Sequence, residues 1–525
     1  MIRTPRPSVP QSLAAVAAGS LVFVSACSSG AGTAPDVKTE PGKGGGTAVV
    51  AMTSDPDTLM PWKATQFQAV NVLGNIYGTL TDYDKDLGTV PGLAEKWEPA
   101  ADGKSLTLTL RKGVKFTDGS DFDATDAKFS LDAIRDEKTA AVARSALANV
   151  TDVAVVDPAT VKLTLSAPDA ALPSGLASVN MAMLPAEAAT PATMTALETT
   201  PNGTGAFTFE SRTPSQSVKL KRNDAYWGDK ALLDGVEFRV MPDENAIVTA
   251  LKSGNVHLAG INDPLVAQTA EGGDLTVTKT KQLSYHALQL KATSTTNPAL
   301  KDVNVRLAIS CAIDRQQVLD TAAYGEGEVT GPITAPEFTS DAGARPCPKR
   351  DVAKSKDLLS KAGKSALTIK TIVSQGEYAT SVNEAQNLKS QLAESGITLD
   401  LEVLDIAAFV KRWVAGDFEA AVALNGGRPD PDTMYGRYFT SAGNLQKVAG
   451  YSSPELDALF AQGKATSDEG KRKDIYAQVS KHLEDNAAWV WLFTGNTYTV
   501  ASTKVAGFTP MANSSLQSLR TTTIQ

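Results

Sequence analysis

Residues 91–132 read PGLAEKWEPAADGKSLTLTLRKGVKFTDGSDFDATDAKFSLD, and their pattern predicts strands that lead into a helix. In the middle of the stretch three leucines alternate with serine and threonine, the period-two pattern of a strand with one buried face: Leu106, Leu108 and Leu110. An Asp-Gly pair on either side of this strand supplies a tight turn. Thr125 and Asp126 stand where the N-cap and first turn of a helix are expected. The stretch therefore predicts a β-meander that continues into a helix.

The same stretch resembles the signature block of the bacterial extracellular solute-binding proteins of family 5, the peptide, nickel and oligosaccharide receptors of ABC importers. That block runs from LAE-x-W through an Asp-Gly turn to a strand ending in LR-x-G-V-x-F, and then to a second Asp-Gly turn and an A-x-D helix start. Other segments resemble further family motifs: GTGAF at 203–207, RNDAYW at 222–227, ALKSG at 250–254, KDVNVRLA at 301–308 and AIDR at 312–315. The resemblance covers roughly residues 45–510.

This resemblance implies an α/β fold of the periplasmic-binding-protein type, a two-lobed type II clamp in which helices flank mixed sheets. Lobe I would comprise 47–285 and 495–525, with 76–200 as an extra subdomain, and lobe II would comprise 286–494. Two strands that cross near residues 285 and 494 would form the hinge. The ligand would lie between the lobes and be enclosed when they close, because it fits the closed state better.

Beyond residue 286 the pattern itself changes to helices that end at glycine and are followed by strands. Two of these helices are expected to begin at the capping residues Asp302 and Asp351. Another is expected to start at Ser452-Ser453-Pro454-Glu455, which has capping-box spacing and a proline in the first turn. A helix over 382–395 ends at Gly396, and an alternating strand over 397–403 follows directly. This succession is typical of an α/β sheet.

The N-terminus carries the features of a secretory signal. Arg3 and Arg6 precede an apolar run over 13–26, which is too short to span a bilayer as a mature anchor. Val-Ser-Ala-Cys at 24–27 resembles the lipobox of bacterial lipoproteins, in which Cys27 would be acylated; the alternative is an ordinary buried thiol. We therefore expect a signal peptide over 1–26 and a lipidated flexible tether over 27–46. The protein would be exported and held at the outer face of the cytoplasmic membrane, in the cell envelope.

Net charge and cysteine content limit the partners and the cysteine chemistry that this protein can have. The 525 residues include 50 Lys and Arg against 58 Asp and Glu, a formal net charge of −8, which argues against nucleic acid and anionic lipid headgroups as partners. After Cys27 only Cys311 and Cys347 remain. In an oxidising envelope they can form one disulfide that closes a loop of about 36 residues, and the alternative is two unpaired thiols. Neither has a second Cys or His at zinc-ligand spacing.

Enzyme motifs are missing from the sequence. None of the three histidines begins H-E-x-x-H, and no serine lies in G-x-S-x-G. There is no G-x-x-x-x-G-K-[ST] loop either, so the chain needs a partner ATPase and permease to power transport. We expect a non-enzymatic protein without cofactor or metal, with a secreted envelope hydrolase as the remote alternative.

The segment 424–435, LNGGRPDPDTMY, bears most on the ligand. Many peptide binders of the family carry an aspartate three positions before an Asp-Pro here, and it pairs with the ligand's α-ammonium; this chain has Gly427 instead. A free peptide N-terminus would have to use Asp430 or Asp432, which alternatively only shape a proline-rich turn. Arg428 could hold a carboxylate bidentately or merely neutralise its neighbours. The predicted ligand-binding residues of this segment are Asn425, Gly427, Arg428, Asp430, Asp432 and Tyr435.

Aromatic side chains are expected to supply the apolar walls of the ligand pocket. Trp62 follows the first predicted strand, whereas Trp491 and Phe493 lie near the second hinge crossing. Trp489, Trp491 and Phe493 alternate, so they are expected to share one face of a strand, and that face could equally belong to the core.

The sequence as a whole thus predicts a substrate-binding lipoprotein of an ABC import system. It would act as a monomer, capture a solute between two lobes and deliver it to the permease subunits and their ATPase. Peptide is the favoured ligand, and the alternative is a non-peptide solute such as an oligosaccharide, a nickel chelate or a porphyrin-like molecule.

Overall fold

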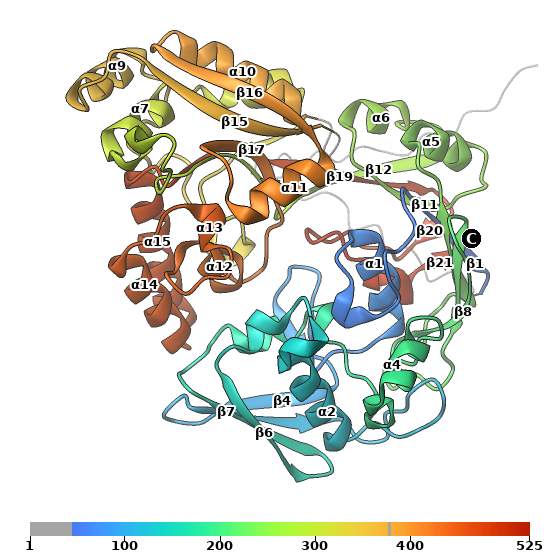
Figure 1. The fold of residues 1–525 in the computed structure, drawn as a ribbon. Helices are drawn as coiled ribbons and strands as arrows, with labels where there is room; N and C mark the ends of the chain where they lie inside the picture. Colours follow the sequence, from blue (N-terminus) through green and yellow to red (C-terminus); the bar gives the residue numbers. More distant parts are fainter. Residues whose placement is uncertain (1–44, 376–379) are drawn as a thin grey trace, which may run out of the picture. The chain divides into compact units, whose positions relative to one another are not determined.

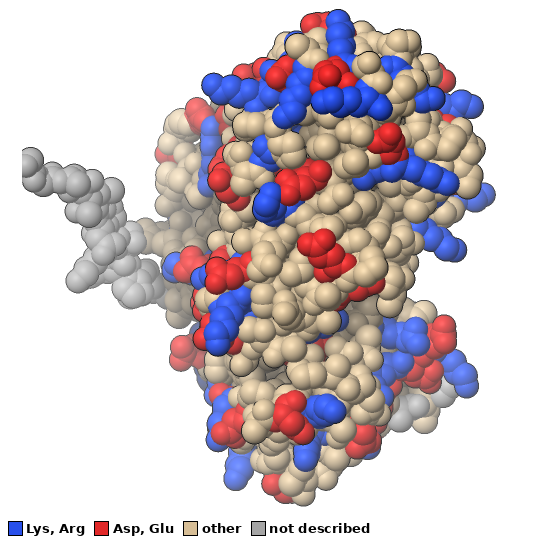
Figure 2. Space-filling view, turned by 90° about the vertical axis from the view of Figure 1, so that its left-hand side faces the viewer, with Lys and Arg blue, Asp and Glu red and all other residues tan. Residues whose placement is uncertain are grey.

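The computed structural model describes residues 45–375 and 380–525 (Figure 1). The predicted signal peptide, Cys27 and nearly all of the predicted tether lie outside the described residues. Within the described ranges, no helix is both long and apolar enough to cross a membrane. On the face shown in Figure 2, acidic and basic side chains are interspersed among uncharged ones.

A mixed eight-stranded sheet within the described chain has the order β12-β19-β11-β1-β10-β9-β8, with β14 paired to β19. Its strands are β1 (Thr47–Met52), β8 (Phe207–Thr213), β9 (Ser217–Arg222), β10 (Gly235–Val240), β11 (Leu258–Ile261), β12 (Leu275–Lys281), β14 (Gly327–Val329) and β19 (Phe493–Ser502). Strand β1 is parallel to β10 and β11, and the other pairs are antiparallel. Helices α5 (Glu244–Lys252) and α6 (Pro264–Thr269) bury Ile247 and Val266 in one core with Val500 of this sheet.

The stretch that decides the fold forms part of an antiparallel sheet with the order β4-β5-β7-β6. Its strands are β4 (Ala94–Pro99), β5 (Ser105–Leu110), β6 (Val150–Asp157) and β7 (Thr160–Leu165). The leucines of β5 are buried and the residues between them are partly exposed, so the predicted one-sided strand is confirmed. These leucines share a core with Leu131 of α2 (Ala124–Arg135), which lies against β6 (Figure 1).

The predicted start of α2 was two residues too late. The N-cap is Asp123, whose carboxylate accepts a hydrogen bond from the backbone N–H of Thr125 at 2.6 Å. Asp126 completes a capping box by accepting from the N–H of Asp123 at 2.8 Å. Either aspartate satisfies the sequence signal for a cap, and only the backbone geometry separates their two roles.

Shorter elements complete this part of the chain. They are α1 (Phe67–Ile76), α3 (Leu172–Gly175), α4 (Pro191–Leu197), the pair β2 (Thr81–Tyr83) with β3 (Thr89–Pro91), and the pair β20 (Val505–Ala506) with β21 (Thr523–Ile524).

A separate sheet has the order β16-β15-β17-β13-β18, and its strands β13 and β18 are buried on both faces. Its strands are β13 (Tyr285–Leu290), β15 (Leu367–Gln375), β16 (Ile397–Asp405), β17 (Ala420–Asn425) and β18 (Trp489–Trp491). Every residue of β13 is buried, and successive residues such as Ala287 and Leu288 belong to different cores. A central strand covered on both faces explains the unbroken apolar runs in this region.

Helices flank this second sheet, and α10 packs on β15 and β16 (Figure 1). The helices are α7 (Val303–Cys311), α8 (Arg315–Ala322), α9 (Val352–Lys361), α10 (Ser381–Ala393), α11 (Ile406–Ala415), α12 (Arg437–Phe439), α13 (Gln446–Ala449), α14 (Pro454–Ala465) and α15 (Glu469–Asp485). The predicted caps Asp302 and Asp351 each accept a backbone N–H. The helix expected to start at 452–455 is α14, and its N-cap is Ser453, which accepts from the N–H of Leu456 at 3.1 Å. Gly396 adopts the left-handed conformation that ends its helix, with φ of 81°.

The predicted disulfide between Cys311 and Cys347 is confirmed. Both cysteines are buried in the core that also contains Leu358 and Leu359 of α9. The bond joins the end of α7 to the loop that precedes α9, across 36 residues of sequence.

The chain passes between the two large sheets at residues 282–284 and at Leu492. The Oγ1 atom of Thr494 lies 2.7 Å from the carbonyl oxygens of both Gln282 and Ser284, so the two passages are tied side by side. These passages lie where the sequence predicts the hinge crossings. The division into lobes at residues 285 and 494 stays a prediction.

Candidate functional site

The loop that follows β17 contains most of the predicted ligand-binding residues. Strand β17 ends at Asn425, which is buried and donates a hydrogen bond from Nδ2 to the Tyr285 hydroxyl at 3.4 Å. Gly427 packs against the first passage between the sheets: a Cβ added there would lie 1.9 Å from the carbonyl oxygen of Leu283. Backbone therefore fills the space where an aspartate side chain would begin.

Arg428 is joined by a second arginine that the sequence analysis missed. Both Arg428 and Arg437 are partly buried. Burial and, to a smaller extent, the positive charge of nearby Arg437 lower the pKa of Arg428 to about 10. Arg437 stacks over the ring of Tyr438, with 4.8 Å between its Cζ and the ring centroid. A π-helical turn over Asp432–Gly436 places Arg437 near Arg428, and no motif in the sequence predicts that turn.

The two aspartates of the loop are already paired with cations of this chain. Asp430 accepts from Nη2 of Arg472 at 2.8 Å and also from the backbone N–H of Asp432 at 2.9 Å. Asp432 lies 3.2 Å from Nζ of Lys464. Burial raises the pKa of Asp432 to about 7, with Asp430 and Asp169 adding to the rise and Lys464 opposing it. In this structure both carboxylates are engaged by cations of the chain itself, and a role in binding the ligand stays a prediction.

Segments from the first two hundred residues meet this loop. The backbone N–H of Ala170 donates to the carbonyl oxygen of Lys464 at 2.8 Å. The Tyr83 hydroxyl donates to the carbonyl oxygen of Ser174 at 2.6 Å. Burial raises the pKa of Tyr83 to about 12, and the charges of Arg428 and Asp430 act on it in opposite directions. The site is therefore assembled from parts of the sequence nearly 300 residues apart.

The predicted aromatic walls lie inside packed cores. Trp62 is fully buried and donates from Nε1 to the carbonyl oxygen of Ala182 at 2.8 Å. Trp491 is also fully buried, and its Nε1 donates to the Tyr435 hydroxyl at 3.0 Å. Phe493, the third predicted wall residue, is buried as well. Trp62, Trp491 and Phe493 therefore have no surface to offer a ligand in this structure, which favours a core role for them.

The expectation that Phe493 shares a face with Trp489 and Trp491 is wrong. The two tryptophans belong to one core of the five-stranded sheet, whereas Phe493 belongs to the other. The alternation is reset because β18 ends at Trp491 and β19 begins at Phe493. Phe493 stacks on the ring of His286 with 4.1 Å between centroids.

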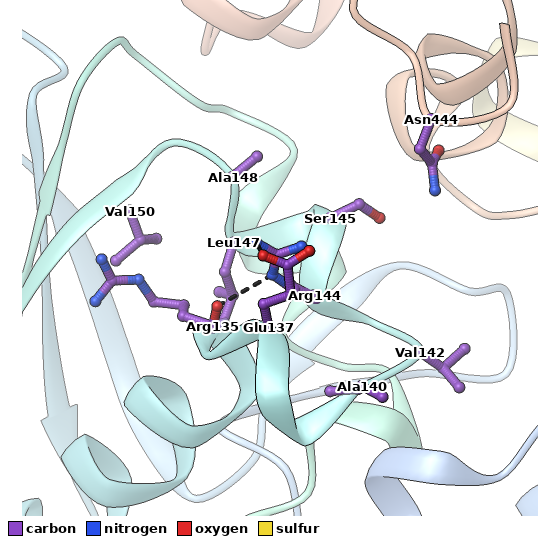
Figure 3. Close-up of a pocket in the computed structure, with 11 residues that line it drawn as sticks. Arg135, Glu137, Ala140, Val142, Arg144, Ser145, Leu147, Ala148, Val150 and Asn444 are labelled. Carbon is purple, nitrogen blue, oxygen red and sulfur yellow. Dashed lines mark hydrogen bonds and ion pairs between the residues drawn. The ribbon is translucent and has the colours of Figure 1, made fainter.

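A cavity of about 710 Å³ lies at the edge of this region (Figure 3). In Figure 3 its wall is formed by the segment 135–150, and Asn444 faces that wall from across open space. The charged groups of the wall are already bonded: Nε of Arg144 donates to the carbonyl oxygen of Arg135 at 3.1 Å. The loop that carries Asn444 is attached to Arg437, whose carbonyl oxygen accepts from the N–H of Leu445 at 2.9 Å. The cavity therefore reaches the segment that is hydrogen-bonded to Arg437, although neither Arg428 nor Arg437 lines the cavity.

No group of three or more His, Cys, Asp or Glu side chains is placed to hold a metal ion in the described part of the chain. His286 is engaged by Glu384, with 2.9 Å between Nδ1 and the carboxylate.

Comparison with known proteins shows similarity along nearly the whole chain. The family profile described as "Bacterial extracellular solute-binding proteins, family 5 Middle" matches residues 88–446. The glutathione-binding protein GsiB of Salmonella choleraesuis is 26% identical, over 91% of this chain and 94% of that protein. The probable di/tripeptide-binding protein 5 of Pseudomonas aeruginosa is 28% identical, over 82% of this chain and 86% of that protein.

Solved structures show a similarity of fold that also extends over nearly the whole chain. The PBP AgaA of A. tumefaciens R10, in complex with agropinic acid, is 28% identical and superposes with a TM-score of 0.78 over 91% of this chain and 99% of that chain. The predicted fold class is confirmed: the chain has the α/β fold of the two-lobed periplasmic binding proteins, with mixed sheets flanked by helices.

Proposed function

The chain belongs to family 5 of the bacterial extracellular solute-binding proteins, and from this membership we propose that it captures a peptide and delivers it to the permease of an ABC import system. The family consists of solute-binding proteins that work outside the cytoplasm with ABC transporters. One relative is named for glutathione and another for di- and tripeptides, which supports a short peptide as the ligand.

The observation that carries this proposal is the meeting of distant segments at the loop after β17. Tyr83 and Ala170 belong to one part of the chain, whereas Arg428 and Lys464 belong to the part built around the five-stranded sheet. Pivoting at residues 282–284 and Leu492 would separate these groups and expose the site. A binding site that is complete only when two lobes meet is what a clamp requires.

We further propose that the protein acts as a monomeric lipoprotein. Acylation of Cys27 would hold it at the outer face of the cytoplasmic membrane, and residues 28–46 would connect the anchor to the folded body. Because the sequence carries no nucleotide-binding loop, the energy for uptake would come from the partner ATPase. No catalytic step is assigned to the chain.

A non-peptide solute is the second candidate. The observation that favours it is Gly427, which stands where many peptide binders of the family carry an acidic anchor. The AgaA structure, which contains agropinic acid, is 28% identical to this chain.

Native mass spectrometry of protein purified without refolding tests the proposal. After incubation with a mixture of di- to pentapeptides, we expect retained peptides of unchanged mass, together with a smaller radius of gyration in solution scattering and a higher melting temperature. Cleaved peptides would instead indicate a hydrolase. A retained oligosaccharide or metal chelate would identify the second candidate, and an unchanged scattering profile with bound ligand would contradict the clamp.

A further inference from the structure

We propose that Arg428 and Arg437 together form an anion-binding site that holds a carboxylate or phosphate group of the ligand. This inference rests on the proposed binding function and adds the chemical class of the solute: it is anionic at this end.

The two arginines differ from the other buried arginines because they lack partners. Arg345 lies 3.2 Å from Glu484, Arg472 lies 2.8 Å from Asp430, and Arg315 donates to the carbonyl oxygen of Trp491 at 2.7 Å. In contrast, no described residue forms an ion pair or hydrogen bond with either the Arg428 or the Arg437 side chain. Two partly buried like charges without a counter-charge destabilise the folded protein. A negatively charged group bound beside them would therefore be stabilising.

The orientation of Arg437 gives a second, independent observation. Its Nε atom is buried and has no hydrogen-bond partner among the described residues. A buried N–H of a charged group is normally satisfied, and a bound oxygen ligand would satisfy this one. Stacking on Tyr438 fixes the plane of the guanidinium, which prepares it for a bidentate contact.

The neighbouring side chains cannot supply that negative charge. Tyr83 and Tyr438 are phenols whose pKa burial raises, so they stay neutral. The nearest carboxylates of the loop, Asp430 and Asp432, are held by Arg472 and Lys464. An external anion is therefore the group that completes the arrangement.

The same arrangement disfavours an ammonium group. A ligand cation placed beside two guanidinium groups would be repelled, and Gly427 offers no carboxylate to offset that repulsion. A peptide would thus be recognised here by its carboxyl end or an acidic side chain. A non-peptide acid or a phosphorylated solute presents the same chemistry.

The first test uses small anions and needs no knowledge of the natural ligand. Succinate and inorganic phosphate, each compared with sodium chloride at equal ionic strength, are added to wild type, Arg428→Gln, Arg437→Gln and the control Arg222→Gln, which makes the same charge change in β9. We expect at least one anion to raise the melting temperature of wild type and of the control and to have little effect on the other two variants. Which anion acts tells a carboxylate site from a phosphate site.

Without any anion, Arg428→Gln and Arg437→Gln should melt at a higher temperature than wild type, because each removes an uncompensated charge. Lower melting temperatures would show that the two guanidinium groups are satisfied within the fold, and equal responses of all four proteins to the anions would show that the anions bind elsewhere. Either result overturns the site.

The second test separates this inference from the proposed function. Random tetrapeptide pools with free ends, with an N-acetyl group or with a C-terminal amide are offered to wild type, and retained peptides are identified by mass. We expect N-acetylated peptides to be retained at least as well as free ones, and amidated peptides to be depleted about tenfold or more. Equal retention of amides would leave peptide binding intact and remove the anion site. Retention of no pool, with stabilisation by succinate or phosphate, would remove the peptide and keep the anion site.

Discussion

The α-carbon of Gly427 faces the carbonyl oxygen of Leu283 so closely that a Cβ at position 427 would lie 1.9 Å from that oxygen. Leu283 belongs to the first passage between the two large sheets, so the loop that follows β17 and this passage are packed backbone to backbone. An aspartate, which many peptide binders of the family carry at this position, therefore cannot be introduced here without moving the passage.

We expect Gly427→Ala to destabilise the protein by about 1–3 kcal/mol, because an added methyl group overpacks this contact. Gly426→Ala is the matched control, since a Cβ at 426 would meet no atom within 4 Å, and it should change the free energy of unfolding by no more than about 0.5 kcal/mol. Both values follow from chemical denaturation. Equal stability of the two variants would mean that the loop moves away from Leu283 at little cost.

Asp432 should make stability depend on pH in an unusual direction. Its pKa in the folded protein is about 7 against an ordinary 3.8, so between those values the folded form holds a proton that the unfolded form has released. The contribution of this group therefore falls as pH rises from about 4 to about 7. Relative to Asp432→Asn, the free energy of unfolding of wild type should decrease by up to about 1.4 kcal/mol per pH unit across this window.

The measurement is a series of denaturation curves at several pH values. Asp229→Asn, a change at an exposed carboxylate, serves as the control and should follow wild type. A constant difference between wild type and Asp432→Asn at every pH would contradict the prediction.

Removal of the disulfide should cost about 3–4 kcal/mol of unfolding free energy, the chain-entropy value for a loop of this length. The double variant Cys311→Ala, Cys347→Ala tests this by guanidinium denaturation, and wild type under reducing conditions gives an independent comparison. Because both positions lie in a core, the reduced wild type separates the loss of the bond from the loss of side-chain volume. Unchanged stability after reduction would show that the bond contributes little.

Cys27→Ser should release the protein from membranes, because the proposed lipid anchor would be attached to Cys27. Cell fractionation followed by a salt wash measures this, with Ser28→Ala as a control that keeps the cysteine. A Cys27→Ser protein that stays in the washed membrane fraction would refute the lipoprotein interpretation.

Local structure could be predicted well from the sequence. The alternation in β5, the caps at Asp302 and Asp351 and the glycine stop at Gly396 depend on neighbours within a few residues, and the structure confirms them. The start of α2 was misplaced because Asp123 and Thr125, two residues apart, are both of a type that suits an N-cap. These patterns, together with the family motifs, were sufficient for the fold class.

The site was only half predictable, because its partners come from distant parts of the chain. Arg428 was found through a motif, but Arg437 is placed by a π-helical turn that has no sequence signature. Arg472 and Lys464, which hold Asp430 and Asp432, are 42 and 32 residues away and lie on other helices. The aromatic residues illustrate the same limit, since alternation cannot tell a ligand wall from a core.

The hydroxyl of Thr494 contacts the carbonyl oxygens of Gln282 and Ser284, so the two passages between the large sheets are bonded to each other. Separate linkers would let the flanking bodies slide and twist as well as pivot. In the proposed clamp, a bonded pair would allow rotation but resist shear, so closure would be a movement along a single coordinate. The proposed permease partner could then sense occupancy from the angle between the lobes alone, without contacting the ligand.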